Sequence, residues 1–211
     1  SINGNEVAWG TIGNASTSEG HFFESLNAAG VHQVPMIVNI WDDEFGISVD
    51  NSYQTIKSSI SEALKGFETD GKKKGFELIR VKGWDYPKLI SAYEHASNIC
   101  REKHIPVIIH VIELTQPLGH STSGSHERYK NIERLKWEKE FDCIEKMREW
   151  ILNFELEDGN GNILKFVDDN QELAQQYQVM SIPTIVVEED GQVIDSVMGT
   201  TSKDDIIQRL S

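Results

Sequence analysis

Up to residue 153, short apolar runs alternate with longer segments of helical periodicity. The apolar runs, which are typical of buried strands, cover residues 7–12, 35–41, 76–81 and 105–114. The last of them, IPVIIHVIEL, is so nearly all apolar that it predicts a central strand covered on both faces. Helical patterns follow the first three runs, to about residue 31, at 53–67 and from Trp84 to about residue 103. Strands that alternate with helices predict an α/β fold with a doubly wound, mostly parallel sheet.

The pattern changes after the last strand. Residues 115–132 are rich in Gly, Ser, His and Pro and lack periodicity, which predicts a long loop. Loops of this length inside a compact domain tend to be functional or disordered. Residues 133–154 have an apolar stripe among charged neighbours, so they predict one long amphipathic helix.

The C-terminal part differs in charge from the rest of the chain. Residues 154–211 hold 12 acidic and 3 basic residues, whereas residues 1–153 hold 22 acidic and 17 basic ones. A turn-rich linker at 154–161 therefore separates a domain at 1–153 from one at 162–211. The second domain predicts a βαββα unit, with strands at 163–167, 184–187 and 192–197, helices at 171–177 and from Ser202, and a hairpin turn at Asp190-Gly191.

Charge and cysteine usage limit the possible partners. The net charge of −14 argues against nucleic-acid binding and against an anionic membrane surface, since both require clustered Lys and Arg. No apolar run approaches membrane-spanning length, and the segment that starts at Ser1 is not expected to be a signal peptide. Cys100 and Cys143 lack metal or redox spacing and are expected to be reduced thiols. These features predict a cytoplasmic protein.

Polar residues follow the first two apolar runs, where Asn14 comes after the first and Asp42-Asp43 after the second. The carboxyl ends of neighbouring parallel strands meet at one edge of a sheet, so Asn14 and Asp43 should lie together beside a helix N-terminus, where α/β folds bind charged ligands. The alternative is structural: Asn14 caps a turn, and the two aspartates end a strand. Taken alone, the two interpretations are evenly matched.

Several stretches of residues 1–153 resemble the alpha part of thiamine-diphosphate-dependent 2-oxo acid dehydrogenases, the decarboxylating component of the pyruvate and branched-chain complexes. They are GNASTSEGHFFESLNAAGVHQVP, WDDEFGISV, KGWDYPKL, PVIIHVIELTQPLGHSTSGSHERY and WEKEFDCIEKMREWIL. The resemblance implies the thiamine-diphosphate-binding fold, truncated at its N-terminus, with thiamine diphosphate and Mg²⁺ as cofactors. It also implies oxidative decarboxylation of a 2-oxo acid substrate, acyl transfer to the lipoyl domain of an acyltransferase component, and an oligomer.

The resemblance assigns the metal ligands to Asn14, Asp43 and the carbonyl of Phe45. The family motif begins Gly-Asp-Gly and ends Asn-Asn, so Asn14 removes a carboxylate while Asp43 restores one negative charge. Either the two changes compensate, or Asn14 weakens metal binding.

Further cofactor contacts are implied at Gly13, Ala15, Ile47, His120 and Ser121, with His120 as the catalytic residue. A histidine beside a diphosphate can donate to it or relay a proton. The alternatives are an ordinary core isoleucine at Ile47 and a surface histidine at His120. His110, within an apolar run, is expected to be a core histidine with its hydrogen bonds satisfied.

In this family, the glutamate that activates the cofactor comes from a beta-type part, so this chain alone is not expected to turn over. Its tail resembles the C-terminal half of thioredoxin-like folds, and Ser181-Ile182-Pro183-Thr184 resembles their loop with a cis proline at Pro183. Dithiol exchange is excluded by the missing Cys-x-x-Cys pair. Two other interpretations therefore stay open: a non-catalytic interaction module around Pro183, and an inert chimera of two partial domains.

Overall fold

The computed structural model describes residues 4–120, 125–153, 156–157, 163–167, 184–189 and 192–198. The chain divides into two compact units, Ser1–Lys146 and Met147–Ser211, and each is described by itself. The domain limits at 153 and 162 stay predictions.

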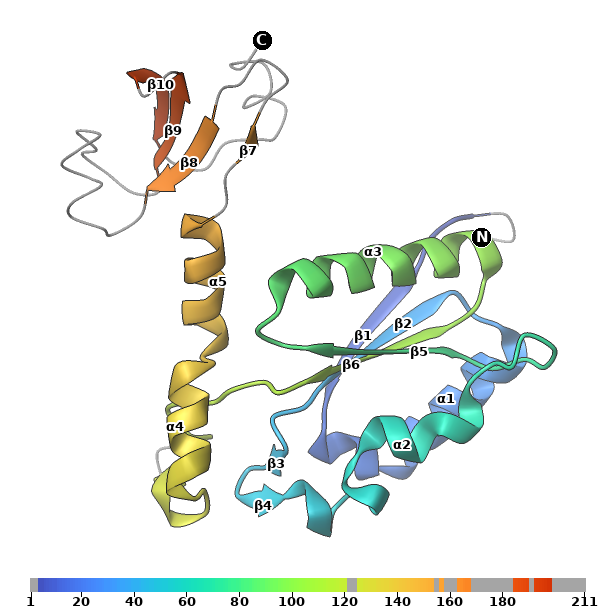
Figure 1. Ribbon diagram of the computed structural model, residues 1–211. Helices are drawn as coiled ribbons and strands as arrows, with labels where there is room; N and C mark the ends of the chain where they lie inside the picture. The colour runs from blue at the N-terminus through green and yellow to red at the C-terminus, as the bar shows by residue number, and fades with distance from the viewer. Residues whose placement is uncertain are drawn as a thin grey trace. The chain divides into compact units, whose positions relative to one another are not determined.

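The first unit is built on a parallel sheet of four strands, in the order β1-β2-β6-β5 (Figure 1). The strands are β1 (Ala8–Gly13), β2 (Met36–Trp41), β5 (Glu77–Lys82) and β6 (Val107–Ile112). They confirm the α/β class and all four strands expected in this part of the chain. Five of the six residues of β6 are buried, because this strand lies between β2 and β5 and is covered on both faces.

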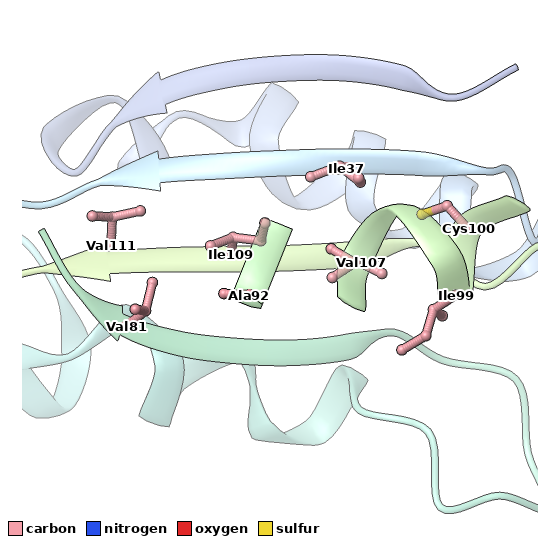
Figure 2. Close-up of a cluster of buried hydrophobic side chains, with 9 residues drawn as sticks. Ile37, Val81, Ala92, Ile99, Cys100, Val107, Ile109 and Val111 are labelled. Atoms are coloured by element: carbon pink, nitrogen blue, oxygen red, sulfur yellow. The ribbon is translucent and has the colours of Figure 1, made fainter. Parts of the chain in front are cut away.

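Helices cover both faces of this sheet. Helix α3 (Tyr86–Lys103) lies on one face, and α1 (Gly20–His32) and α2 (Ile60–Leu64) lie on the other (Figure 1). Alternate residues of β6 serve the two faces: Val107 and Ile109 contact the α3 side, whereas Ile108 packs with α1 and α2. Figure 2 shows the first of these clusters, in which strand side chains meet Ala92, Ile99 and Cys100 of α3.

The start of α3 follows from its sequence. Asp85 is the N-cap residue and accepts a hydrogen bond from the backbone N–H of Lys88 at 3.3 Å, and Pro87 occupies the first turn, where its missing N–H is not needed. Near its other end, Cys100 is buried and free, and its thiol donates to the carbonyl of Ile105 at 3.3 Å. Cys143 is also free, so the expectation of reduced thiols is confirmed.

The helix predicted at residues 53–67 is wrong in its continuity. The chain forms 3₁₀ turns at η2 (Asn51–Tyr53) and η3 (Ile56–Ser58), then α2, then η4 (Lys65–Phe67). Lys57 has φ of +61°, which no α-helix contains, and Ser59 caps α2 as a new start. Upstream, a hairpin of β3 (Phe45–Gly46) and β4 (Val49–Asp50) was not predicted.

The single helix predicted at residues 133–154 is also wrong. Two helices occupy this region, α4 (Ile132–Glu140) and α5 (Cys143–Leu152). The break occurs because the carboxylate of Asp142 accepts from the backbone N–H groups of Ile144 and Glu145, at 2.8 and 3.3 Å, which starts a new helix. Before α4, the predicted loop contains a 3₁₀ turn, η5 (His126–Arg128).

The second unit contains an antiparallel sheet in the order β10-β9-β8-β7. Its strands are β7 (Leu156–Glu157), β8 (Ile163–Val167), β9 (Thr184–Glu189) and β10 (Gln192–Met198). Strands β8, β9 and β10 were predicted; β7 was not. The helices predicted at 171–177 and from Ser202, the Asp190-Gly191 turn and Pro183 lie outside the described residues. In the described part of the chain, no helix is long and apolar enough to span a bilayer.

Candidate functional site

An open cavity of about 800 Å³ lies at the carboxyl ends of β1 and β2. The two strand ends meet because Gly13 pairs with Trp41, and the backbone N–H of Asn14 donates to the Trp41 carbonyl at 3.0 Å. The cavity walls include all but one of the predicted site residues: Gly13, Asn14, Ala15, Asp43, Phe45, Ile47 and His120. Ser121 lies outside the described residues. The fold therefore brings distant segments together, and the roles of these residues stay predictions.

Asn14 has an unusual hydrogen-bonding state. The residue is only 4% exposed, yet its Nδ2 atom has no hydrogen-bond partner among the residues that the structure describes. Its backbone carbonyl accepts from the hydroxyl and the N–H of Thr17, at 2.6 and 3.1 Å, and so starts the 3₁₀ turn η1 (Ala15–Ser18) ahead of α1. Buried polar side-chain atoms nearly always have partners, so a partnerless amide at a cavity wall points to a ligand group.

The adjacent aspartates at the end of β2 differ in what they contact. Asp42 is buried, and its two oxygens accept from the N–H of Glu44 and lie against Nε2 of His110, both at 2.8 Å. Asp43 lines the cavity, and one of its oxygens accepts from the N–H of Phe45 at 3.1 Å. The strand-ending interpretation therefore describes Asp42, whereas Asp43 is available to a ligand.

The environment of Asp43 disfavours its negative charge. Burial raises the pKa of the Asp43 carboxyl above its usual value, and the hydrogen bond from Phe45 and the charge of Lys130 act in the opposite direction. A carboxylate with a perturbed pKa in a concave site is typical of functional residues. A cation bound at this wall would compensate the charge that burial disfavours.

His110 lies in the core with both ring nitrogens engaged. Nδ1 contacts the hydroxyl of Ser61 on α2, and Nε2 contacts Asp42. The contact is possible because residues 108 and 110 of β6 and residue 40 of β2 face the α1–α2 side, and Asp42 continues that alternation. The prediction of a satisfied core histidine is confirmed. All three residues are buried and none lines the cavity, so they support the site without forming it.

The loop after Asp43 has a strained backbone. Glu44 and Ile47 have φ of +68° and +59°, and a β-branched residue rarely adopts such a value. Ile47 is 61% exposed, so it is not the ordinary core isoleucine of the alternative interpretation. Gly46 lies between them at a close approach, because a Cβ atom there would be 2.8 Å from Cβ of Ala15. Strain of this kind clusters at functional sites.

Ile47→Gly should stabilise the first unit. Glycine adopts positive φ without the steric penalty, but it also makes the unfolded chain more flexible, so the free energy of unfolding should rise by about 0.5–1 kcal/mol. Urea unfolding followed by tryptophan fluorescence measures it. The matched control is Ile56→Gly, since Ile56 is also exposed but does not have positive φ, and this variant should lose stability. A loss of stability in Ile47→Gly would contradict the assignment of strain.

His120 lines the cavity from the long loop after β6. A hydrogen bond joins its backbone to the hydroxyl of Tyr129, and the ring of Tyr129 lies 5.5 Å from that of Phe45. The segment of Phe45 and the loop of His120 are thereby connected through two aromatic rings.

Sequence reasoning missed part of the site. Trp41, Gln54 and Thr115 also line the cavity. Arg134 of α4 donates to the backbone carbonyl of Asp43, and Lys130, two residues before that helix, lies beside the Phe45 ring. Their sequence signal is weak, because a lysine and an arginine in a charged amphipathic helix are usually solvated. Within the described residues, no group of three or more His, Cys, Asp or Glu side chains could hold a metal ion. A metal would therefore depend on amide and carbonyl oxygens as well as Asp43.

Comparison with known proteins gives matches for both parts of the chain. The profile of the dehydrogenase E1 component family matches residues 2–182, and the thioredoxin profile matches residues 159–211. The pyruvate dehydrogenase E1 component subunit alpha of Mycoplasma genitalium is 25% identical over 180 residues, which cover 85% of this chain and 48% of that protein.

Relatives named for branched-chain substrates match as well. The mitochondrial 2-oxoisovalerate dehydrogenase subunit alpha 2 of Arabidopsis thaliana is 30% identical over 142 residues, or 66% of this chain and 28% of that protein. The 3-methyl-2-oxobutanoate dehydrogenase subunit alpha of Mycobacterium tuberculosis is 28% identical over 141 residues, with coverages of 66% and 36%. The chain thus spans half or less of the length of these relatives. Since the family profile matches most of its residues, the chain belongs to the dehydrogenase E1 component family.

Proposed function

We propose that the cavity binds the diphosphate of thiamine diphosphate together with Mg²⁺. The chain would then be the alpha-type segment of a 2-oxo acid dehydrogenase decarboxylating component, incomplete without a beta-type part. The observation that carries the proposal is the partnerless amide of Asn14, which shares one cavity with the Asp43 carboxylate in a chain of this family.

The donor set fits these ligands. Mg²⁺ takes oxygen ligands and usually shares them between carboxylates, water and substrate phosphates, so few protein ligands suffice. The Asn14 side chain offers an oxygen for the metal and N–H groups that can donate to a phosphate oxygen. Asp43 supplies the negative charge, and the carbonyl of Phe45 is the third ligand that the family motif assigns.

The remaining residues would orient and enclose the ligand. Gly13 and Ala15 border the cavity beside Asn14, and the exposed Ile47 offers an apolar surface to the cofactor. His120 would donate to a phosphate oxygen or move a proton at the reacting centre. Bound thiamine diphosphate supplies the carbanion stabilisation that decarboxylation of a 2-oxo acid requires.

Titration calorimetry tests the proposal. The chain is titrated with thiamine diphosphate in the presence of Mg²⁺, with and without a beta-type dehydrogenase part. Mg²⁺-dependent heat is expected at least with the beta-type part, and no heat in either case would overturn the proposal. It would favour an interaction module or an inert scaffold.

Asp43→Asn tests the metal ligand. Because this substitution removes the only carboxylate among the proposed ligands, the affinity for thiamine diphosphate with Mg²⁺ should fall about 10-fold or more. The matched control is Asp70→Asn, in an exposed turn far along the chain, where the asparagine oxygen can still accept from the N–H groups of Lys72 and Lys73. Equal losses in both variants would argue against Asp43 as a ligand.

Asn14→Asp decides between the two interpretations of the family motif. If Asn14 weakens metal binding, the added carboxylate should tighten Mg²⁺-dependent binding. If Asp43 compensates for Asn14, the variant should bind no more tightly than the original chain.

Acyl transfer to a lipoyl domain and assembly into an oligomer are further parts of the proposal. A reconstituted mixture of the chain, a beta-type part and a lipoyl domain should form acyl-lipoyl product from a 2-oxo acid, whereas the chain with the lipoyl domain alone should not.

A further inference from the structure

A buried charged cluster lies next to the cavity without lining it. It consists of Lys130, Arg134 and Glu138. The side chains of Lys130 and Glu138 are each 1% exposed, and the ammonium of Lys130 donates to both carboxylate oxygens of Glu138 at 2.7 and 2.8 Å. Arg134 donates from Nε to the same carboxylate at 2.8 Å. The hydrogen bond to Glu138 therefore fixes the Nε end of the Arg134 guanidinium.

The other end of the Arg134 guanidinium holds residues 43–45, called the site loop here. Nη2 donates to the backbone carbonyl of Asp43 at 2.9 Å, and Nη1 pairs with the carboxylate of Glu44. The guanidinium carbon also lies 5.5 Å from the centre of the Phe45 ring. One side chain thus contacts all three residues of the loop, about 90 positions earlier in the sequence.

This contact differs from an ordinary surface ion pair. Exposed pairs contribute little because both side chains are free to move and water screens the charges. Here the Arg134 side chain is largely buried, and the planar fork makes separate hydrogen bonds to Glu138 and to the loop. The loop itself needs support, because Glu44 has φ of +68°. Lys130 adds a second contact, with its ammonium 5.1 Å from the Phe45 ring centre.

We propose that Arg134 is a positioning residue, which fixes the backbone of the site loop so that the Asp43 carboxylate and the Phe45 carbonyl are available at the cavity. The proposal rests on the proposed function for what the loop binds. The contacts of Arg134 with the site loop are made by the chain itself, without any ligand. Ligand binding at the strand ends thereby depends on a helix that follows the whole sheet in sequence.

Hydrogen exchange measured by NMR on the ligand-free chain tests whether Arg134 fixes the backbone of the site loop. In Arg134→Met, the backbone amides of Glu44 and Phe45 should exchange about 10-fold faster or more, since a charge-assisted hydrogen bond is lost. The amides of β2 and β6 should keep their rates. The matched control is Lys136→Met, an exposed cation of the same helix, which should change neither set. Unchanged rates at Glu44 and Phe45 in Arg134→Met would overturn the proposal.

A second variant covers the case in which Arg134→Met loosens the whole unit. Arg134→Lys keeps the positive charge beside Glu138 but cannot present the planar fork to Glu138, Asp43 and Glu44 at once. Sheet amides should then keep their rates while those of Glu44 and Phe45 become faster. Rates equal to the original chain at both amides, together with unchanged rates in Arg134→Met, would overturn the positioning role. Equal rates in Arg134→Lys alone would show that charge suffices without the planar fork.

Calorimetry then connects the loop to the site. The affinity for thiamine diphosphate with Mg²⁺, measured with the beta-type part, should fall about 10-fold in Arg134→Met and stay unchanged in Lys136→Met. If the original chain binds nothing, the proposed function fails. The exchange rates still test whether Arg134 fixes the site loop. If exchange becomes faster but affinity is unchanged, the positioning role is overturned.

Discussion

His110→Leu should destabilise the first unit by about 3–5 kcal/mol, because it leaves a buried carboxylate without its strongest partner. Among the described residues, the Asp42 carboxylate would retain only the N–H of Glu44, and the hydroxyl of Ser61 would lose its contact with Nδ1. Leucine fills most of the imidazole volume, so the loss reflects unpaired polar groups more than a cavity. Urea unfolding measures it through the tryptophans of the first unit, which are Trp9, Trp41, Trp84 and Trp137.

The control for this variant is His95→Leu. His95 lies on α3 and is exposed, and its ionic contact within the described residues is a 3.9 Å approach to Glu77. Its replacement should therefore change the free energy of unfolding by no more than about 0.5 kcal/mol. If His110→Leu were equally mild, Asp42 would have to find another partner, and the supporting role assigned to the three buried residues would be wrong.

Lys130→Met should have a similar effect, about 3–5 kcal/mol, because Glu138 would then be a buried carboxylate neutralised by Arg134 alone. The double variant Lys130→Met with Glu138→Leu should be less destabilised than Lys130→Met, since replacing both members of a buried ion pair removes the unpaired charge. Both are measured by urea unfolding. The double-variant cycle gives the interaction free energy of the pair directly.

Lys139→Met is the matched control, because Lys139 is an exposed cation on the same helix. It should be nearly neutral. A double variant that is less stable than either single variant would mean that the pair contributes little and that packing explains the losses.

The sheet of the first unit was predictable because its signal is local. Parallel strands covered on both faces need nearly continuous apolar runs, and the segment IPVIIHVIEL is such a run. The helices that failed, at 53–67 and 133–154, have the apolar spacing of helices throughout. Their interruptions depend on single residues, Lys57 with positive φ and Asp142 as a cap, which hydrophobic periodicity does not register.

The meeting of Asn14 and Asp43 at the candidate site was predictable for a similar reason. Residues that follow parallel strands converge at one edge, which brought Asn14 and Asp43 to the same cavity. The difference between Asp42 and Asp43 was not predictable, because it depends on His110 in a strand 68 residues later. The hold of Arg134 on the site loop likewise joins residues about 90 positions apart, and no local pattern specifies such a contact.

The placement of the two aspartates makes the site depend on the length of β2. Successive residues of a strand face opposite sides, so Asp42 reaches the core because an even number of steps separates it from Ile40, which faces the same side. Deleting one residue between Met36 and Trp41 would reverse the sides that Asp42 and Asp43 face, although both aspartates would remain in the sequence. The parity of one strand, as much as the identity of its last residues, determines which carboxylate is left for a ligand.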